Sequence, residues 1–231
     1  GEDPELALAV TEEVSKLVPK SNVVGQAFKI HGHAFVSLLD GLLVWDDLDN
    51  SNQNPLNLAP LQIDRGKDGA TIQHWLGIPW ESPDVILLPG FHTPTENGLK
   101  KMKPKGISRL GDELFLTSMG LLGAGSRTLL LSRWRTGGRI TADLLKEFIQ
   151  ELPNTSAPDA WQRAVQIAEQ TPLNPATEPR VEADPDGPQV TGGHPFFWSS
   201  FVLIDPGAAG IAGKKEPPEN LAFPDAAGDG E

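Results

Sequence analysis

Apolar residues recur every three to four positions in several stretches of the chain, and this spacing predicts amphipathic α-helices. The stretches are 4–17, 112–122, 141–152 and 156–170. Pro19 follows the first stretch and Gly123 the second, which suits helix ends. Thr141 is predicted to cap the third helix. A shorter helix is predicted over 72–76.

Short apolar runs bounded by Pro, Gly and Asp alternate with these helices and predict β-strands. The predicted strands are 27–39, 42–45, 85–88, 127–134 and 197–204. The run from Thr128 to Leu131 is continuously apolar after its first residue. Such a run is typical of a parallel strand that is covered on both faces.

Alternating strands and helices predict crossover connections and a mainly parallel sheet between helices. We therefore expect an α/β protein with a three-layer α/β/α sandwich. The pattern favours a single domain over 1–205, with a long loop at 49–69 and a Pro- and Asp-rich connection at 171–193. A Pro-, Gly- and Ala-rich acidic tail, 206–231, is predicted to be disordered.

Charge narrows the list of partners. The net charge is −12 and the pI is about 4.8, whereas nucleic acids and anionic membrane surfaces bind positively charged proteins. The longest apolar run falls short of the ~18 residues that a membrane helix needs. We expect no nucleic-acid or membrane partner. Because the chain carries no signal peptide, we expect a cytoplasmic protein, with Gly1 as the start of a fragment or processed piece.

Cofactor chemistry finds little support. The chain has no Cys, which excludes disulfides, thiolate metal sites and a Cys nucleophile. Gly120, Gly123 and Gly125 lie at the end of a predicted helix rather than between a strand and a helix, so they do not form a dinucleotide fingerprint. We expect no cofactor.

The most informative segment is 84–93, in which the strand 85–88 runs into a turn at Pro89 and Gly90. In open α/β sheets the carboxyl end of a strand is where ligands bind and catalytic groups lie. Phe91 occupies this place, and its side chain has no group that performs chemistry. A phenylalanine at a strand end more often packs in the core.

Three further segments carry a family resemblance: 111–134, which ends in Ser132-Arg133-Trp134; the helix 157–168; and 194–203, which reads His-Pro-Phe-Phe-Trp-Ser-Ser-Phe-Val-Leu. With them, the chain from the first predicted helix to Ile204 resembles the CHAT domain. This module belongs with the caspases and separases and often follows tetratricopeptide repeats. The resemblance implies a caspase-like sandwich that forms the C-terminal part of a larger protein.

Peptidases of this family use a His after one strand and a Cys after the next, and the Cys thiolate attacks the scissile carbonyl. The resemblance places His33, with His31 as the second choice, at the histidine position and Phe91 at the cysteine position. It implies a vestigial site of His33, Gly90, Phe91 and His92. We expect a non-catalytic pseudopeptidase for binding, scaffolding or regulation, whose partner is a protein, a peptide or another domain of the parent chain.

The segment after Trp134 also departs from the family, which usually has an Asp there; this chain reads Arg-Thr-Gly-Gly over 135–138. Arg133, Arg135 and Arg139 form a basic cluster that could bind an acidic peptide or a carboxylate. Arginines at strand ends also commonly pair with acids of their own chain, here Asp112 or Glu113.

Two other functions stay open. One is a hydrolase on the same scaffold, in which His33 or His92 activates a nearby Ser or Thr. His92 with Thr93 is a weak pair, since neighbours on an extended segment point in opposite directions. The other is a peptide-binding or assembly module that uses the arginine cluster and the loop 49–69.

Metal binding is the least supported class. The candidate ligands are His31, His33 and His92 for zinc, and Asp46, Asp47 and Asp49 for calcium. The histidines lack a closely spaced zinc motif. The aspartates lack the glycine and the glutamate that a calcium loop places at set positions. We expect no metal site and a solvated acidic loop.

Overall fold

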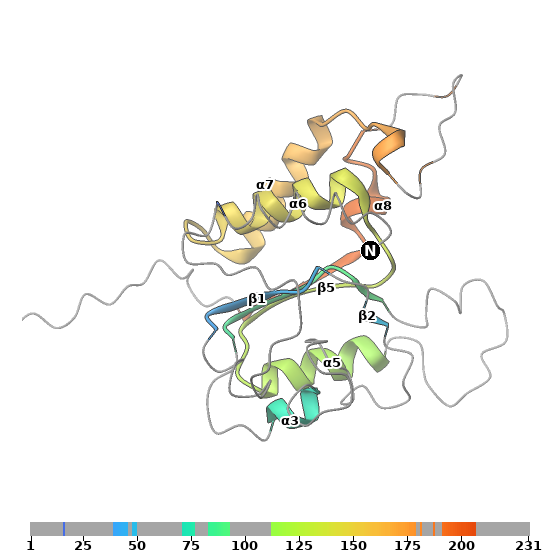
Figure 1. The fold of residues 1–231 in the computed structure, drawn as a ribbon. Coiled ribbons are helices and arrows are strands. Elements are labelled where there is room, and N and C mark those ends of the chain that lie inside the picture. Colours follow the sequence, from blue (N-terminus) through green and yellow to red (C-terminus); the bar gives the residue numbers. More distant parts are fainter. Residues whose placement is uncertain are drawn as a thin grey trace, which may run out of the picture.

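The computed structural model describes residues 16, 39–45, 48–49, 71–76, 83–92, 112–178, 181, 187 and 191–206. The strands are β1 (Gly41–Leu43), β2 (Leu48–Asp49), β3 (Val85–Leu88), β4 (Phe91–His92), β5 (Thr128–Ser132) and β6 (Phe201–Ile204). The helices are α3 (Ile72–Leu76), α5 (Asp112–Gly123), α6 (Gly138–Glu151), α7 (Ala157–Gln170), the 3-10 helix η3 (Pro175–Thr177) and α8 (Pro195–Trp198). Figure 1 shows their arrangement.

A mainly parallel sheet lies at the centre, as predicted. Its strand order is β1-β3-β5-β6. The first three strands are parallel, with Val85 opposite Thr128, and β6 is antiparallel to β5. A separate parallel pair, β2 and β4, places Leu48 opposite Phe91.

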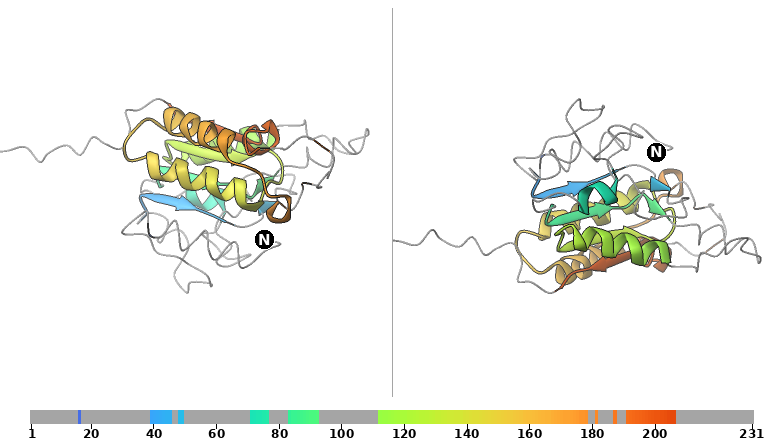
Figure 2. Two further views of the ribbon diagram at one scale, coloured as in Figure 1. Left: turned by 90° about the horizontal axis from the view of Figure 1, so that it is seen from above. Right: turned by 90° about the horizontal axis from the view of Figure 1, so that it is seen from below.

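Helices cover both faces of the sheet, which confirms the three-layer α/β/α sandwich (Figures 1 and 2). Successive residues of a strand point to opposite faces. Leu87 and Leu130 therefore join the core beneath α6, α7 and α8, and Ile86 and Leu129 join a second core beneath α5. All five side chains of β5 are buried, because both faces of the strand are covered.

Helices with strong local signals lie where they were predicted. α3 spans the predicted residues and α5 extends the predicted helix by one residue. In α7, the Ser156 side chain accepts a hydrogen bond from the Asp159 backbone N–H at 3.3 Å and caps the helix. Small residues line the buried face of α7: Ala157, Ala160, Ala164 and Ala168. Figure 2 shows α6 and α7 packed side by side on one face of the sheet.

The predicted start of α6 was wrong. Thr141 does not cap the helix; Gly137 does, and the helix begins at Gly138. Thr141 lies in the first turn, and its Oγ1 donates to the Gly137 carbonyl at 2.9 Å. Gly137 and Gly138 have φ values of 152° and 80°, which a glycine adopts without strain, so the chain can turn into the helix three residues earlier.

The first half of the predicted strand 197–204 was also wrong, because residues 195–198 form the short helix α8. Pro195 suits the first turn of a helix, since its missing N–H would have no helical partner. His194 caps α8, and its Nδ1 accepts from the Phe196 N–H at 3.2 Å. The strand β6 begins only at Phe201.

Two other predicted strands are shorter in the structure. The strand predicted over 42–45 is β1, and the one predicted over 127–134 is β5. The helix predicted over 4–17, apart from Lys16, and the strand over 27–39, apart from Leu39, lie outside the described residues. So do the tail after Pro206 and the loop 49–69 after Asp49, which belongs to β2.

Candidate functional site

The strand ends at the carboxyl edge of the sheet form the candidate site. Because β3 and β5 run parallel, both end at this edge. The chain leaves β3 through a turn at Pro89 and Gly90 and enters β4 at Phe91. The Leu48 N–H donates to the Gly90 carbonyl at 2.9 Å and holds the turn against β2. Open α/β sheets bind ligands at such an edge.

Phe91 fills this position with an apolar ring. Its side chain is 0% exposed and belongs to the core beneath α5. Leu48 lies opposite it in the strand pair, and Leu121 of α5 belongs to the same core. Removing a side chain of this size from water contributes about 1.5–3 kcal/mol to stability. The ring thus serves packing at a place where other folds of this class present chemical groups.

Ser132, the last residue of β5, ties this turn to the central strand. Its side chain is buried, and its Oγ donates to the Pro89 carbonyl at 2.7 Å and also to the Phe91 carbonyl. Because a hydroxyl has one proton, Ser132 shares it between the two carbonyls that flank Gly90. This is the strongest described link between the end of β5 and the Phe91 turn.

The variant Ser132→Ala is expected to lower the free energy of unfolding by about 1–3 kcal/mol, because it leaves buried carbonyls without their donor. Urea denaturation followed by far-UV circular dichroism measures the change. The control is Ser200→Ala, since Ser200 is equally buried but donates only to the nearby Phe197 carbonyl, at 2.8 Å. Equal losses in the two variants would contradict a special role for Ser132.

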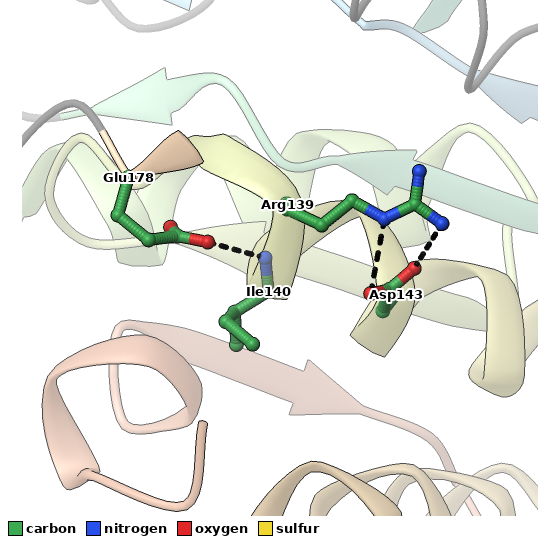
Figure 3. A network of polar contacts seen from close by, with 4 residues as sticks. All are labelled: Arg139, Ile140, Asp143 and Glu178. Carbon is green, nitrogen blue, oxygen red and sulfur yellow. Dashed lines mark hydrogen bonds and ion pairs between the residues drawn. The ribbon is translucent and has the colours of Figure 1, made fainter. Parts of the chain in front are cut away.

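Glu178 is a residue of this edge that the sequence analysis missed. It follows η3, and its Oε1 accepts a hydrogen bond from the Ile140 backbone N–H at 2.8 Å (Figure 3). Gly137 has no side chain to cap α6, so this carboxyl group satisfies a free N–H of the first helical turn. The glycine pair was the single sequence signal, because 38 residues separate Glu178 from Ile140.

Burial raises the pKa of Glu178 from 4.5 to about 7. Hydrogen bonds from the backbone of Ile140 and Arg139 oppose this rise, and the negative charge of Asp143 adds to it. The second oxygen, Oε2, is buried and has no hydrogen-bond partner among the described residues. Desolvation dominates because an ionised carboxylate loses more hydration than a neutral carboxyl group.

Two further polar atoms of the connection between β5 and α6 are buried without a partner, the Trp134 Nε1 and the Thr136 Oγ1. Buried polar atoms are nearly always paired, and each unpaired one costs about 1–3 kcal/mol. The hydrogen bonds of this connection therefore do not fully offset the free-energy cost of burying its polar atoms.

Comparison with known proteins identifies this half of the molecule. The family model of the CHAT domain matches residues 104–206, which run from just before α5 to the end of β6. Over these residues, somewhat less than half of the chain, the protein is similar to the CHAT domain. Neither a curated protein nor a solved structure gave a match to the chain.

The CHAT match confirms the family that the sequence motifs indicated and agrees with an α/β sandwich of the caspase type. It includes Ser132, Trp134 and Glu178. It does not include residues 1–103, where the predicted histidine and cysteine positions lie. The assignment of Phe91 to the cysteine position therefore stays a prediction.

The structure brings only part of the predicted vestigial site together. Gly90 and Phe91 form the turn described above. His92 follows in β4, and its backbone lies opposite Asp49. The side chain of His92 is not among the parts that the structure describes. His31 and His33 lie outside the described residues altogether.

The predicted binding arginines contact their own chain, as the contacts of Arg133 and Arg139 show. Arg133 Nη2 donates to the Ser199 carbonyl, and its guanidinium lies 5.0 Å from the centre of the Trp134 ring. Arg139 forms a two-point ion pair with Asp143, at 3.2 Å from Nε and 3.1 Å from Nη2. Arg135 is half-buried. In the described structure, then, the acid that pairs with Arg139 lies one turn along its own helix.

The side chains that the structure describes contain no group of three or more His, Cys, Asp or Glu that could hold a metal ion. Within the same part of the chain, no helix is long and apolar enough to cross a membrane.

Proposed function

We propose that this protein is a non-catalytic CHAT-like module, a pseudopeptidase scaffold that serves binding, assembly or regulation. The observation that carries the proposal is the fully buried ring of Phe91 at the turn after β3. A cysteine peptidase needs a thiolate that reaches the substrate carbonyl. A benzyl group has no electron pair to donate, and the chain contains no Cys at any other position.

The environment of the turn supports this proposal. Ser132 is the described hydroxyl that contacts the turn, but its side chain is 0% exposed. It donates to the carbonyls of Pro89 and Phe91. A nucleophilic serine must instead face the substrate and give its proton to a base. Ser132 thus has the contacts of a structural residue.

The partner that we propose is a protein, a peptide or another domain of the parent chain, in a cytoplasmic setting. The charge of −12 supports this choice over nucleic acid. The internal contacts of Arg133 and Arg139 mean that binding of an acidic peptide by these residues would first have to break the Ser199 and Asp143 contacts.

The test of the proposal is a direct search for turnover. The protein and its His33→Ala variant are incubated with broad peptide libraries, and with Cys-directed and Ser-directed covalent probes. We expect cleavage at the level of buffer alone for both proteins, and no covalent labelling. Robust cleavage that disappears in His33→Ala would overturn the proposal and favour a hydrolase with a different nucleophile.

A second arm uses Phe91→Cys, which places a thiol at the proposed nucleophile position. Cleavage should not appear unless His33 and the substrate pocket have also been kept. Recovered cleavage would show that the nucleophile alone had been lost. The correct fold of the variant is checked by its far-UV circular dichroism spectrum.

A further inference from the structure

The start of α6 is capped by a carboxyl group from another part of the chain. The first turn of α6 contains no acidic residue, and its N-cap Gly137 offers no side chain. Segment 171–178 continues from the end of α7 through η3 and ends at Glu178, which accepts the Ile140 N–H (Figure 3). The cap is therefore a tertiary contact, which breaks when the segment moves away.

The 171–193 connection packs tightly against the start of α6. A Cβ atom on Gly138 would overlap the Glu178 Oε2 and lie 2.7 Å from the Thr177 carbonyl oxygen. On the other side, a Cβ on Gly192 would lie 2.9 Å from the Ile140 Cδ1. Pro172 pairs with Thr191 in an isolated antiparallel bridge. The first described part of the 171–193 connection thus meets the start of α6. Its last part meets both the start of α6 and the end of α7.

We call the arrangement closed when segment 171–178 packs against the start of α6. Burial of the Glu178 carboxyl group then costs free energy, and separation of the segment from the helix would remove this cost. Oε2 of Glu178 is buried and has no hydrogen-bond partner in the part of the chain that the structure describes. Water would reach Oε2 once segment 171–178 leaves the helix. A neutral carboxyl group is less costly to bury than a carboxylate, so the closed arrangement depends on the proton of Glu178.

We propose that Glu178 is a proton-operated latch, which keeps segment 171–178 closed over the start of α6 while it is protonated and releases the segment as it ionises. The latch regulates the exposure of the start of α6 and does not depend on whether the protein cleaves peptides.

The direction follows from linkage. The closed state holds a proton up to a pKa of about 7, whereas an open, hydrated Glu178 would release it near 4.5. Between these values the closed state binds more protons than the open state, so closure weakens as pH rises and levels off above about pH 7.

Other charged groups lie close to the latch. Among the described residues, Asp143 of α6 disfavours ionisation of Glu178, while Arg139 of the same helix is paired with Asp143. Glu169, at the end of α7, contacts Gly193. His194 caps α8 at the end of the same connection and is a titratable side chain. The experiment must therefore separate Glu178 from His194.

Hydrogen exchange measured by mass spectrometry over pH 5.5–8.5 tests the latch, with peptides that cover 138–142 and 171–178. After correction for intrinsic exchange, protection of both peptides in the wild-type protein should fall about 30-fold across this range, if opening frees the carboxyl completely. Glu178→Gln keeps an oxygen for the Ile140 N–H but cannot ionise, so its protection should stay constant within about twofold.

Glu147→Gln is the matched control, because it makes the same change on α6 away from the latch, and His194→Gln removes the histidine. Both should keep the wild-type pH profile. Gly138→Ala should expose the two peptides already at pH 5.5, because the added methyl group overlaps Glu178. A flat wild-type profile, or an unchanged pH dependence in Glu178→Gln, would overturn the latch; loss of the dependence in His194→Gln would assign it to the histidine instead.

Discussion

Replacing Phe91 with alanine should lower the free energy of unfolding by about 3–5 kcal/mol, the range found for large aromatic side chains removed from a core. Phe91 is 0% exposed and lies opposite Leu48 in the strand pair. Helix α5 covers it through Leu121, so the neighbours have little freedom to collapse into the space. The loss combines the transfer of apolar atoms with a residual cavity.

Urea denaturation, followed by both fluorescence and circular dichroism, measures this loss. The control is Phe115→Ala on α5, since Phe115 is 62% exposed and its removal should change stability by less than about 0.5 kcal/mol. A loss below about 1 kcal/mol for Phe91→Ala would mean that the ring does not fill the core. It would also remove the observation on which the proposed function rests.

Phe148→Ala should produce a loss of similar size, about 3–5 kcal/mol, on the opposite face of the sheet. Phe148 is 0% exposed in the core beneath α6 and α7. Its ring meets Trp161 edge to face at 5.6 Å between centroids, and Trp161 meets Phe201 at 5.2 Å. Such aromatic pairs add about 0.5–1.5 kcal/mol beyond the buried area.

The same denaturation experiment measures Phe148→Ala, with Ile167→Ala on the exposed side of α7 as its control. The double variant Phe91→Ala/Phe148→Ala should show the sum of the two losses within about 0.5 kcal/mol, because the residues belong to separate cores. A strong departure from additivity would show that the sheet couples its two faces.

The two features of the carboxyl edge have different chemistry. After β3 an apolar ring is buried at Phe91, and after β5 a carboxyl group caps the next helix. Stability at the first should not change with pH, whereas closure at the second should weaken as pH rises toward 7. Hydrogen exchange at the two places would thus distinguish them within a single molecule.

Elements with local causes could be predicted from the sequence. The apolar run 85–88 indicated a strand, and the run 128–131 indicated a strand that is covered on both faces; β3 and β5 confirm these predictions. The apolar spacing over 156–170 indicated α7. The motifs in segments 111–134, 157–168 and 194–203 indicated the CHAT family, whose model matches residues 104–206. In each case the determining residues lie within a few positions of the element.

What the sequence by itself determined is therefore the alternation of strands and helices, the layers that they form and the family of the C-terminal half. The tertiary structure alone decided where α6 begins, because its cap comes from Glu178, 38 residues after Ile140. It also decided that Leu48 and Leu121 share the core with Phe91 and that Ser132 holds its turn. Side chains distant in the chain make these contacts, and no local pattern encodes which of them will meet.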